Sequence, residues 1–111
     1  MIDKESGLLK LCDFGVAQFF PSDNDLLRGT QGTARFMAPE AFEPPTEHSS
    51  GLRGRPLDIW ACGVSLYLML TKEFPFTGRN LSELQRQIRC DQPDYSKVTC
   101  ARAVSLLQHL L

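Results

Sequence analysis

Residues 56–71, PLDIWACGVSLYLMLT, are the longest apolar stretch of this sequence, and they predict how the chain is organised. Between positions 57 and 70 only three residues are not plainly apolar: Asp58, Gly63 and Ser65. A helix that is apolar on all sides is either buried in a protein core or embedded in a membrane. Fourteen residues rise roughly 21 Å, which is short of the ~30 Å hydrocarbon layer. We therefore expect the stretch to be the buried central helix of a domain.

Two residues indicate how this helix begins. Pro56 suits a first helical turn, where its missing amide costs no hydrogen bond. Asp58 would place a negative charge near the positive end of the helix dipole. The carboxylate has two interpretations: it is simply a charge at the helix end, or it holds another backbone segment in place.

Composition restricts the classes of function. The chain has 111 residues, 42% apolar content and a net charge of −1, which fit one domain and give no electrostatic reason to expect nucleic acid or an anionic membrane as a partner. The two histidines, His48 and His109, have no neighbouring ligands and indicate no metal site. The cysteines are widely spaced, as free thiols of a cytoplasmic protein would be. They are Cys12, Cys62, Cys90 and Cys100.

The remaining pattern predicts a mainly α chain with one short strand. Residues 8–12 form a brief apolar run that predicts the strand, and residues 38–42 predict a single helical turn. The spacing of Asn80 and Glu83 is typical of a helix-capping pair, so we expect a helix over 81–89.

Three apolar positions (Leu81, Leu84 and Ile88) fall on one face of that helix. A last helix is expected over 101–111, with an apolar stripe flanked by further leucines. The stripe is Val104, Leu107 and Leu111, and the flanking residues are Leu106 and Leu110. Residues 21–35, 43–56 and 90–98 read as loops, and 73–78 as a turn with two exposed aromatics, Phe74 and Phe76.

Three motifs follow one another in order. Asp13-Phe14-Gly15 comes after the predicted strand, residues 32–40 read GTARFMAPE, and residues 58–64 read DIWACGV. Together, at this spacing, they resemble the large C-terminal lobe of a eukaryotic serine/threonine protein kinase. The residues of these motifs are most similar to those of the calmodulin-dependent kinase kinases. The resemblance implies that residues 1–111 are a partial kinase domain, with an activation segment at 13–40 and a central helix at 56–71.

The resemblance also implies roles for the residues around the first motif. Asp13 matches the carboxylate that binds the Mg²⁺ bridging the ATP phosphates, so ATP and Mg²⁺ are the expected cofactors. Phe14, followed by Gly15, would pack into the hydrophobic column between the lobes. Cys12 would line the nucleotide pocket, where an electrophile that fits the pocket could label it.

Further roles follow for the other two motifs. Thr33 matches the threonine that contacts the catalytic aspartate, and Phe36 and Met37 lie in the wall that meets the substrate residue after the acceptor. Glu40 would pair with an arginine beyond residue 111. Asp58, with Trp60 and Gly63 at family spacing, would hydrogen-bond the backbone of the catalytic loop.

Thr30 is the candidate regulatory phosphorylation site, since it stands two residues before Gly32. A phosphate there could pair with Arg28, Arg35 or an arginine of the catalytic loop. The alternative is that Thr30 and Thr33 are ordinary loop threonines that bond to local backbone groups.

The sequence departs from the family pattern in several ways. It contains no glycine-rich loop, ATP-positioning lysine, His-Arg-Asp catalytic loop or Mg-binding asparagine. Leu68 follows Tyr67 where many kinases that prefer basic substrates carry a glutamate. We therefore expect the chain alone to be inactive, with the small lobe, the rest of the large lobe and a protein substrate, which could itself be a kinase, as partners. The alternative is a non-catalytic interaction module, either a pseudokinase remnant or a truncated product.

Overall fold

The computed structural model describes residues 1–20, 24–27, 29–43 and 51–111. Within these ranges it contains three α-helices, α1 (Gly54–Thr71), α2 (Leu81–Cys90) and α3 (Ala101–Leu110). Three short 3₁₀ helices accompany them: η1 (Ala34–Phe36), η2 (Pro39–Phe42) and η3 (Tyr95–Lys97). The chain is mainly α, as the sequence predicted.

The first helix, α1, begins two residues earlier than expected. Its N-terminal capping residue is Arg53, whose side chain makes no capping hydrogen bond, and its first residue is Gly54. Pro56 is thus the third helical residue, where the amide would still have no partner within the helix. Asp58 lies beyond the first turn, so the prediction of a first-turn charge was wrong. The helix ends where Lys72 turns into the left-handed region, with φ 64°.

One face of α1 packs on α3. Tyr67, Val98 and Leu107 form the buried cluster between these elements. Gly63 allows the close approach, because a Cβ at that position would lie 2.8 Å from the Cβ of Leu110. Tyr67 also donates its hydroxyl hydrogen bond to the backbone carbonyl of Asp94 at 2.9 Å, which ties α1 to the segment before η3.

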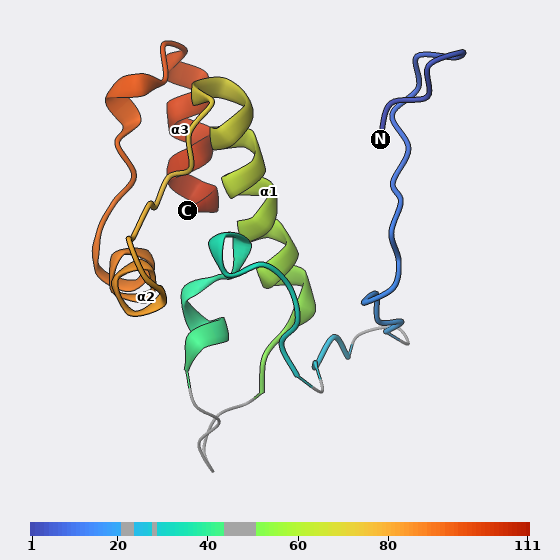
Figure 1. Cartoon of the computed structure of the whole chain (residues 1–111), viewed down its shortest axis with the longest axis horizontal. Helices are drawn as coiled ribbons and strands as arrows, with labels where there is room; N and C mark the ends of the chain where they lie inside the picture. The colour runs from blue at the N-terminus through green and yellow to red at the C-terminus, as the bar shows by residue number, and fades with distance from the viewer. Residues whose placement is uncertain (21–23, 28, 44–50) are drawn as a thin grey trace.

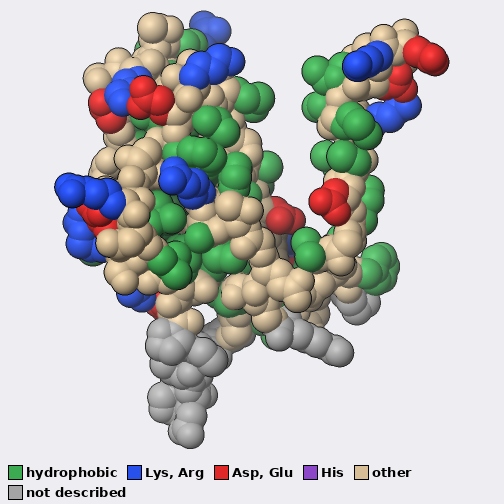
Figure 2. Space-filling model, viewed as in Figure 1, with side chains coloured by type: hydrophobic (Ala, Val, Ile, Leu, Met, Phe, Trp, Pro, Cys, Tyr) green, Lys and Arg blue, Asp and Glu red, His purple; other side chains and the backbone are tan. Residues whose placement is uncertain are grey.

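The expectation that α1 is buried on all sides was wrong for the described residues. Ile59, Met69 and Leu70 are 53%, 64% and 45% exposed. Figure 2 shows apolar side chains running along this side of the helical body. Among the described helices, α1 packs mainly on α3 and η1, and these neighbours leave part of its apolar surface uncovered.

A second cluster joins α2 to η2 and to the turn after α1. Phe76, Leu84 and Ile88 are buried, and the Trp60 ring stacks on Phe76 with centroids 6.1 Å apart. Phe76 was expected to be exposed; burying its ring against Trp60 removes a large apolar area from water. In contrast, Leu81 is 55% exposed, because the first residue of α2 lies beyond this cluster.

The predicted capping pair of α2 is confirmed. The Asn80 side chain accepts a hydrogen bond from the Glu83 amide at 2.9 Å. The Glu83 carboxylate accepts one in return from the Arg79 amide at 3.0 Å. The first bond satisfies an amide that a helix start otherwise leaves unpaired, and the second holds the residue before the cap.

The N-terminal segment lies apart from the helices, as the blue trace in Figure 1 shows. The strand predicted at 8–12 reduces to one antiparallel bridge between Ile2 and Leu9. A single run of strand residues becomes a sheet only when neighbouring strands complete its hydrogen bonds. Among the described residues, only the first few of the chain pair with it.

Parts of the loops predicted at 21–35 and 43–56, and also His48, lie outside the described residues. No helix in the described ranges is both long enough and apolar enough to cross a bilayer.

Candidate functional site

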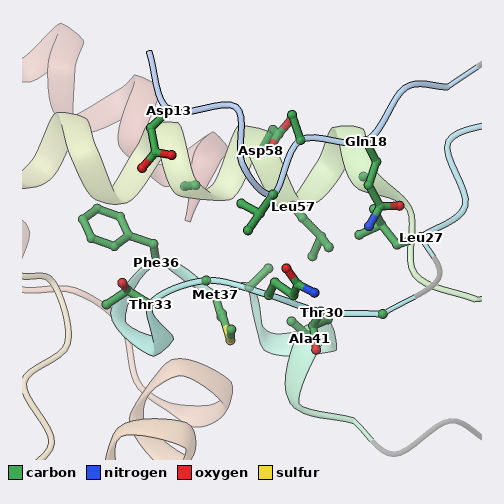
Figure 3. Close-up of a pocket in the computed structure, with 18 of the residues that line it drawn as sticks. Asp13, Gln18, Leu27, Thr30, Thr33, Phe36, Met37, Ala41, Leu57 and Asp58 are labelled. Carbon is green, nitrogen blue, oxygen red and sulfur yellow. The ribbon is translucent and has the colours of Figure 1, made fainter. Parts of the chain in front are cut away.

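A cavity of about 390 Å³ opens where the N-terminal segment, the segment around η1 and the start of α1 meet. Figure 3 shows Asp13 carried by the first of these, Thr33, Phe36 and Met37 by the second, and Asp58 by α1. Thr30 lines the same cavity. Six of the residues singled out in the sequence therefore surround one space, although they span 46 positions of the chain.

Asp13 reaches the cavity through an unusual backbone conformation. Its φ is 67°, in the left-handed region that Asp tolerates better than most residues. The next residues form a tight turn, in which the Ala17 amide donates to the Phe14 carbonyl at 3.0 Å. The Phe14 side chain is 67% exposed, so the described residues provide none of the column into which it was expected to pack.

The turn at η1 holds the opposite wall. The Phe36 amide donates to the Thr33 carbonyl at 2.9 Å, and the Phe36 ring meets Phe74 edge-on with centroids 5.6 Å apart. Among the described residues, the hydroxyls of Thr30 and Thr33 have no hydrogen-bond partner. Both are therefore available to a group that enters the cavity.

Arg35, one of the expected partners of a phosphate on Thr30, faces the other way. Its guanidinium lies over the Phe74 ring, 5.0 Å from the centroid, in a cation–π contact. Arg28, another expected partner, lies outside the described residues.

The remaining motif residues, Glu40, Asp58, Trp60 and Gly63, do not all lie at the cavity. Asp58 lines the cavity and has no hydrogen bond within the described part of the chain, so the backbone it was expected to hold is not among those residues. Trp60 and Gly63 are on other sides of α1, in the contacts described above. Glu40 is exposed, and the nearby ion pair, 3.3 Å between Arg89 and Glu43, uses a different glutamate.

Sequence reasoning missed Asp25, which is only 1% exposed. Its carboxylate accepts hydrogen bonds from the Arg53 Nε at 2.7 Å and from the Arg55 amide at 3.1 Å. The Arg53 guanidinium, together with the Arg55 amide, lowers the pKa of Asp25 below its ordinary value. The sequence offered no usable signal, because the helix was expected to begin at Pro56 and Arg53 was therefore not recognised as its capping residue.

The donors for a metal ion are sparse. In the described ranges, no three His, Cys, Asp or Glu side chains come close enough together to hold an ion. Mg²⁺ is commonly held by one or two carboxylates, with phosphate oxygens and waters completing its shell. Asp13 fits the role of one such carboxylate, and it does not make a metal site alone.

The cysteines are all free and exposed, and Cys12 is not among the residues that line the cavity. Whether it faces a nucleotide stays a prediction.

Comparison with known proteins gives one family for almost the whole chain. Residues 1–110 match the family described as the protein kinase domain. The chain is 40% identical over 86 residues to a serine/threonine-protein kinase of Schizosaccharomyces pombe, which covers 78% of this chain and 23% of that protein.

Two further relatives are similar. A serine/threonine-protein kinase of Arabidopsis thaliana is 40% identical over 83 residues, covering 75% of this chain and 20% of that protein. A calcium/calmodulin-dependent protein kinase kinase of Caenorhabditis elegans is 38% identical over 85 residues, covering 77% of this chain and 15% of that protein. The chain thus spans less than a quarter of the length of each of these relatives.

Proposed function

The chain belongs to the protein kinase domain family, and from that premise we propose that it is part of an enzyme that transfers the γ-phosphoryl group of Mg-ATP to serine or threonine hydroxyls of proteins. The observation that carries the proposal is the shared cavity. It collects the metal-binding candidate Asp13, the substrate-facing candidates Thr33, Phe36 and Met37, and the anchoring candidate Asp58.

Asp13 supplies an oxygen ligand for the metal. When bound, Mg²⁺ neutralises the charge that develops on the phosphates during transfer. The contribution of this chain is to hold one carboxylate in the lining of the cavity, where the left-handed conformation of Asp13 sets its direction.

Thr33 and the two residues of the opposite wall position the protein substrate. The Thr33 hydroxyl has no hydrogen-bond partner among the residues that the structure describes, so it can donate to the aspartate that serves as general base in the complete domain. Phe36 and Met37 offer an apolar surface to the substrate residue that follows the acceptor. The contact of Phe36 with Phe74 fixes that surface in place.

The general base and the lysine that contacts ATP belong, in this proposal, to segments outside residues 1–111. Positioning of the phosphates and of the attacking hydroxyl supplies most of the rate of phosphoryl transfer. Residues 1–111 alone therefore catalyse no transfer.

The test uses the complete kinase domain that contains these residues, with γ-labelled ATP and a protein substrate. We expect transfer that depends on Mg²⁺ and that Asp13→Asn reduces by about 10²- to 10³-fold. The control is Asp91→Asn, whose carboxylate pairs with Arg86 on α2, away from the cavity. Full activity in the Asp13→Asn domain, or Asp13-dependent transfer by residues 1–111 alone, would contradict the proposal.

A further inference from the structure

Asp25 is a buried carboxylate that the proposed reaction does not use. It is the one charged side chain that is buried within the described ranges, at 1% exposure. Removing a carboxylate from water is costly unless hydrogen bonds and an opposite charge compensate. Here both are provided by residues 28 and 30 positions later in the chain, Arg53 and Arg55.

The contact with Arg55 gives Asp25 the role of a helix cap. Gly54 is the first residue of α1, so the Arg55 amide is the second, one of the amides that lack a partner within the helix. The side chain of the capping residue normally accepts such an amide. Arg53 occupies the capping position and cannot do so; the Asp25 carboxylate replaces it from a distant part of the chain.

Backbone hydrogen bonds extend the contact on both sides of Asp25. Leu26 and Arg53 form an antiparallel bridge. The Leu27 amide donates to the Leu52 carbonyl, and the Gly54 amide donates to the Asp25 carbonyl, each at 2.8 Å.

Gly54 permits this approach. A Cβ at Gly54 would lie 2.8 Å from two atoms of the Phe20 ring and 3.5 Å from the Asp25 carbonyl oxygen. The segment before the cavity wall is therefore fixed to the start of α1 by an ion pair, a cap and two backbone bonds.

This attachment reaches the cavity directly. Phe20, Leu27 and Gly54 line it, and Thr30 follows three residues after Leu27. We propose that Asp25 is a positioning residue: by capping α1 from residues 24–27, it sets the place of Leu27 and Thr30 in the wall that a protein substrate meets. Only the effect on substrate rests on the proposed function; the attachment itself does not.

The experiment separates capping from positioning in the complete kinase domain. Asp25→Ala removes both the cap of α1 and the carboxylate that holds residues 24–27 in place. The double variant Asp25→Ala/Arg53→Ser gives α1 a local capping residue again but leaves residues 24–27 without their carboxylate. Three quantities are measured: the thermal midpoint, hydrogen exchange at the Leu27 and Arg55 amides, and KM and kcat for a protein substrate.

We expect Asp25→Ala to lower the midpoint and to speed exchange at both amides by about tenfold, the factor that loss of a cap corresponds to. KM for the protein substrate should rise. In the double variant, the midpoint and the Arg55 amide should recover, while the Leu27 amide still exchanges rapidly and KM stays raised.

Recovery of all three quantities in the double variant would overturn the proposal, because Asp25 would then be only a cap. Unchanged Leu27 exchange in Asp25→Ala would also overturn it. If Asp25→Ala does not fold, Asp25→Asn is the milder change, since it keeps an acceptor for Arg55 but loses the charge; faster Leu27 exchange is still required.

The matched control is Asp91→Ala, which breaks an exposed aspartate–arginine pair on α2 and should leave Leu27 exchange unchanged. Faster Leu27 exchange in this control would show a general loosening and count against a specific role of Asp25. If the unmodified domain transfers no phosphoryl group, the proposed function fails, while the exchange and midpoint results still decide the attachment.

Discussion

Leu107 gives the most direct test of how α1 and α3 pack. Its side chain is 0% exposed and lies with Tyr67 and Val98 in the cluster between the two helices. Truncating a buried leucine to alanine costs roughly 2–5 kcal/mol, depending on how far the surroundings collapse into the space. Leu66 and Leu111 border the cluster and are only partly buried, so they can move inward. We therefore expect a loss of about 2–3 kcal/mol in the free energy of unfolding.

The assay is urea unfolding of residues 1–111 at low protein concentration, followed by far-ultraviolet circular dichroism. With a typical slope of about 1–3 kcal/mol per molar urea, the midpoint should fall by roughly 0.7–3 M. Leu106→Ala is the matched control, because the neighbouring leucine on the same helix is 51% exposed. Half-exposed, it should contribute less than about 1 kcal/mol.

Equal losses in the two variants would refute the packing, since α3 would then present a different face to α1. No loss in either variant would mean that the cluster contributes nothing to stability.

Three other changes test single contacts. Tyr67→Phe removes the hydroxyl that donates to the Asp94 carbonyl at 2.9 Å, and should cost about 0.5–1.5 kcal/mol in the same urea assay. Burial raises the pKa of Tyr67, and it also raises the pKa of the other tyrosine, Tyr95. Alkaline titration followed by absorbance should therefore lose a tyrosinate step above the ordinary tyrosine range in this variant; loss of a step in the ordinary range would contradict the burial of Tyr67. Asn80→Ala removes the acceptor of the Glu83 amide at 2.9 Å and should cost about 1 kcal/mol, with reduced helicity; an unchanged urea midpoint would show that the cap is not needed. The pKa of Asp25 is lowered below 3.8 in the folded state, so its contribution to stability is present above pH 3.8 and is lost as the pH falls further. Between about pH 4 and pH 2, Asp25→Asn should therefore lose less stability than the unmodified chain, and parallel pH profiles would contradict the lowered pKa.

The sequence alone determined the features that depend on neighbouring residues. The helices were found because their periodicity and their terminal residues are local signals. The capping pair of Asn80 and Glu83 lies within one turn, and the Asn80 side chain accepts the Glu83 amide as predicted, while the Glu83 carboxylate accepts the Arg79 amide. The order and spacing of the three motifs identified the family, and the comparisons confirmed it.

The tertiary structure decided which of the possible faces and ends are used. Periodicity placed Leu107 on the apolar stripe of α3 and Leu106 beside it, and the position of α1 then buries Leu107 completely and leaves Leu106 51% exposed. The sequence predicted Phe76 to be an exposed residue of a turn, and only the structure shows that its ring stacks on Trp60.

Asp25 is the clearest case of a feature that local sequence could not reveal. In sequence it is one of several polar residues in a loop, where a carboxylate is normally solvated. Its burial becomes favourable only when Arg53 and the Arg55 amide, 28 and 30 residues away, replace the lost water. The start of α1 in turn depends on that carboxylate, because Arg53 cannot cap the helix itself. Each side of this contact needs the other, and no local sequence pattern encodes a bond between two distant segments.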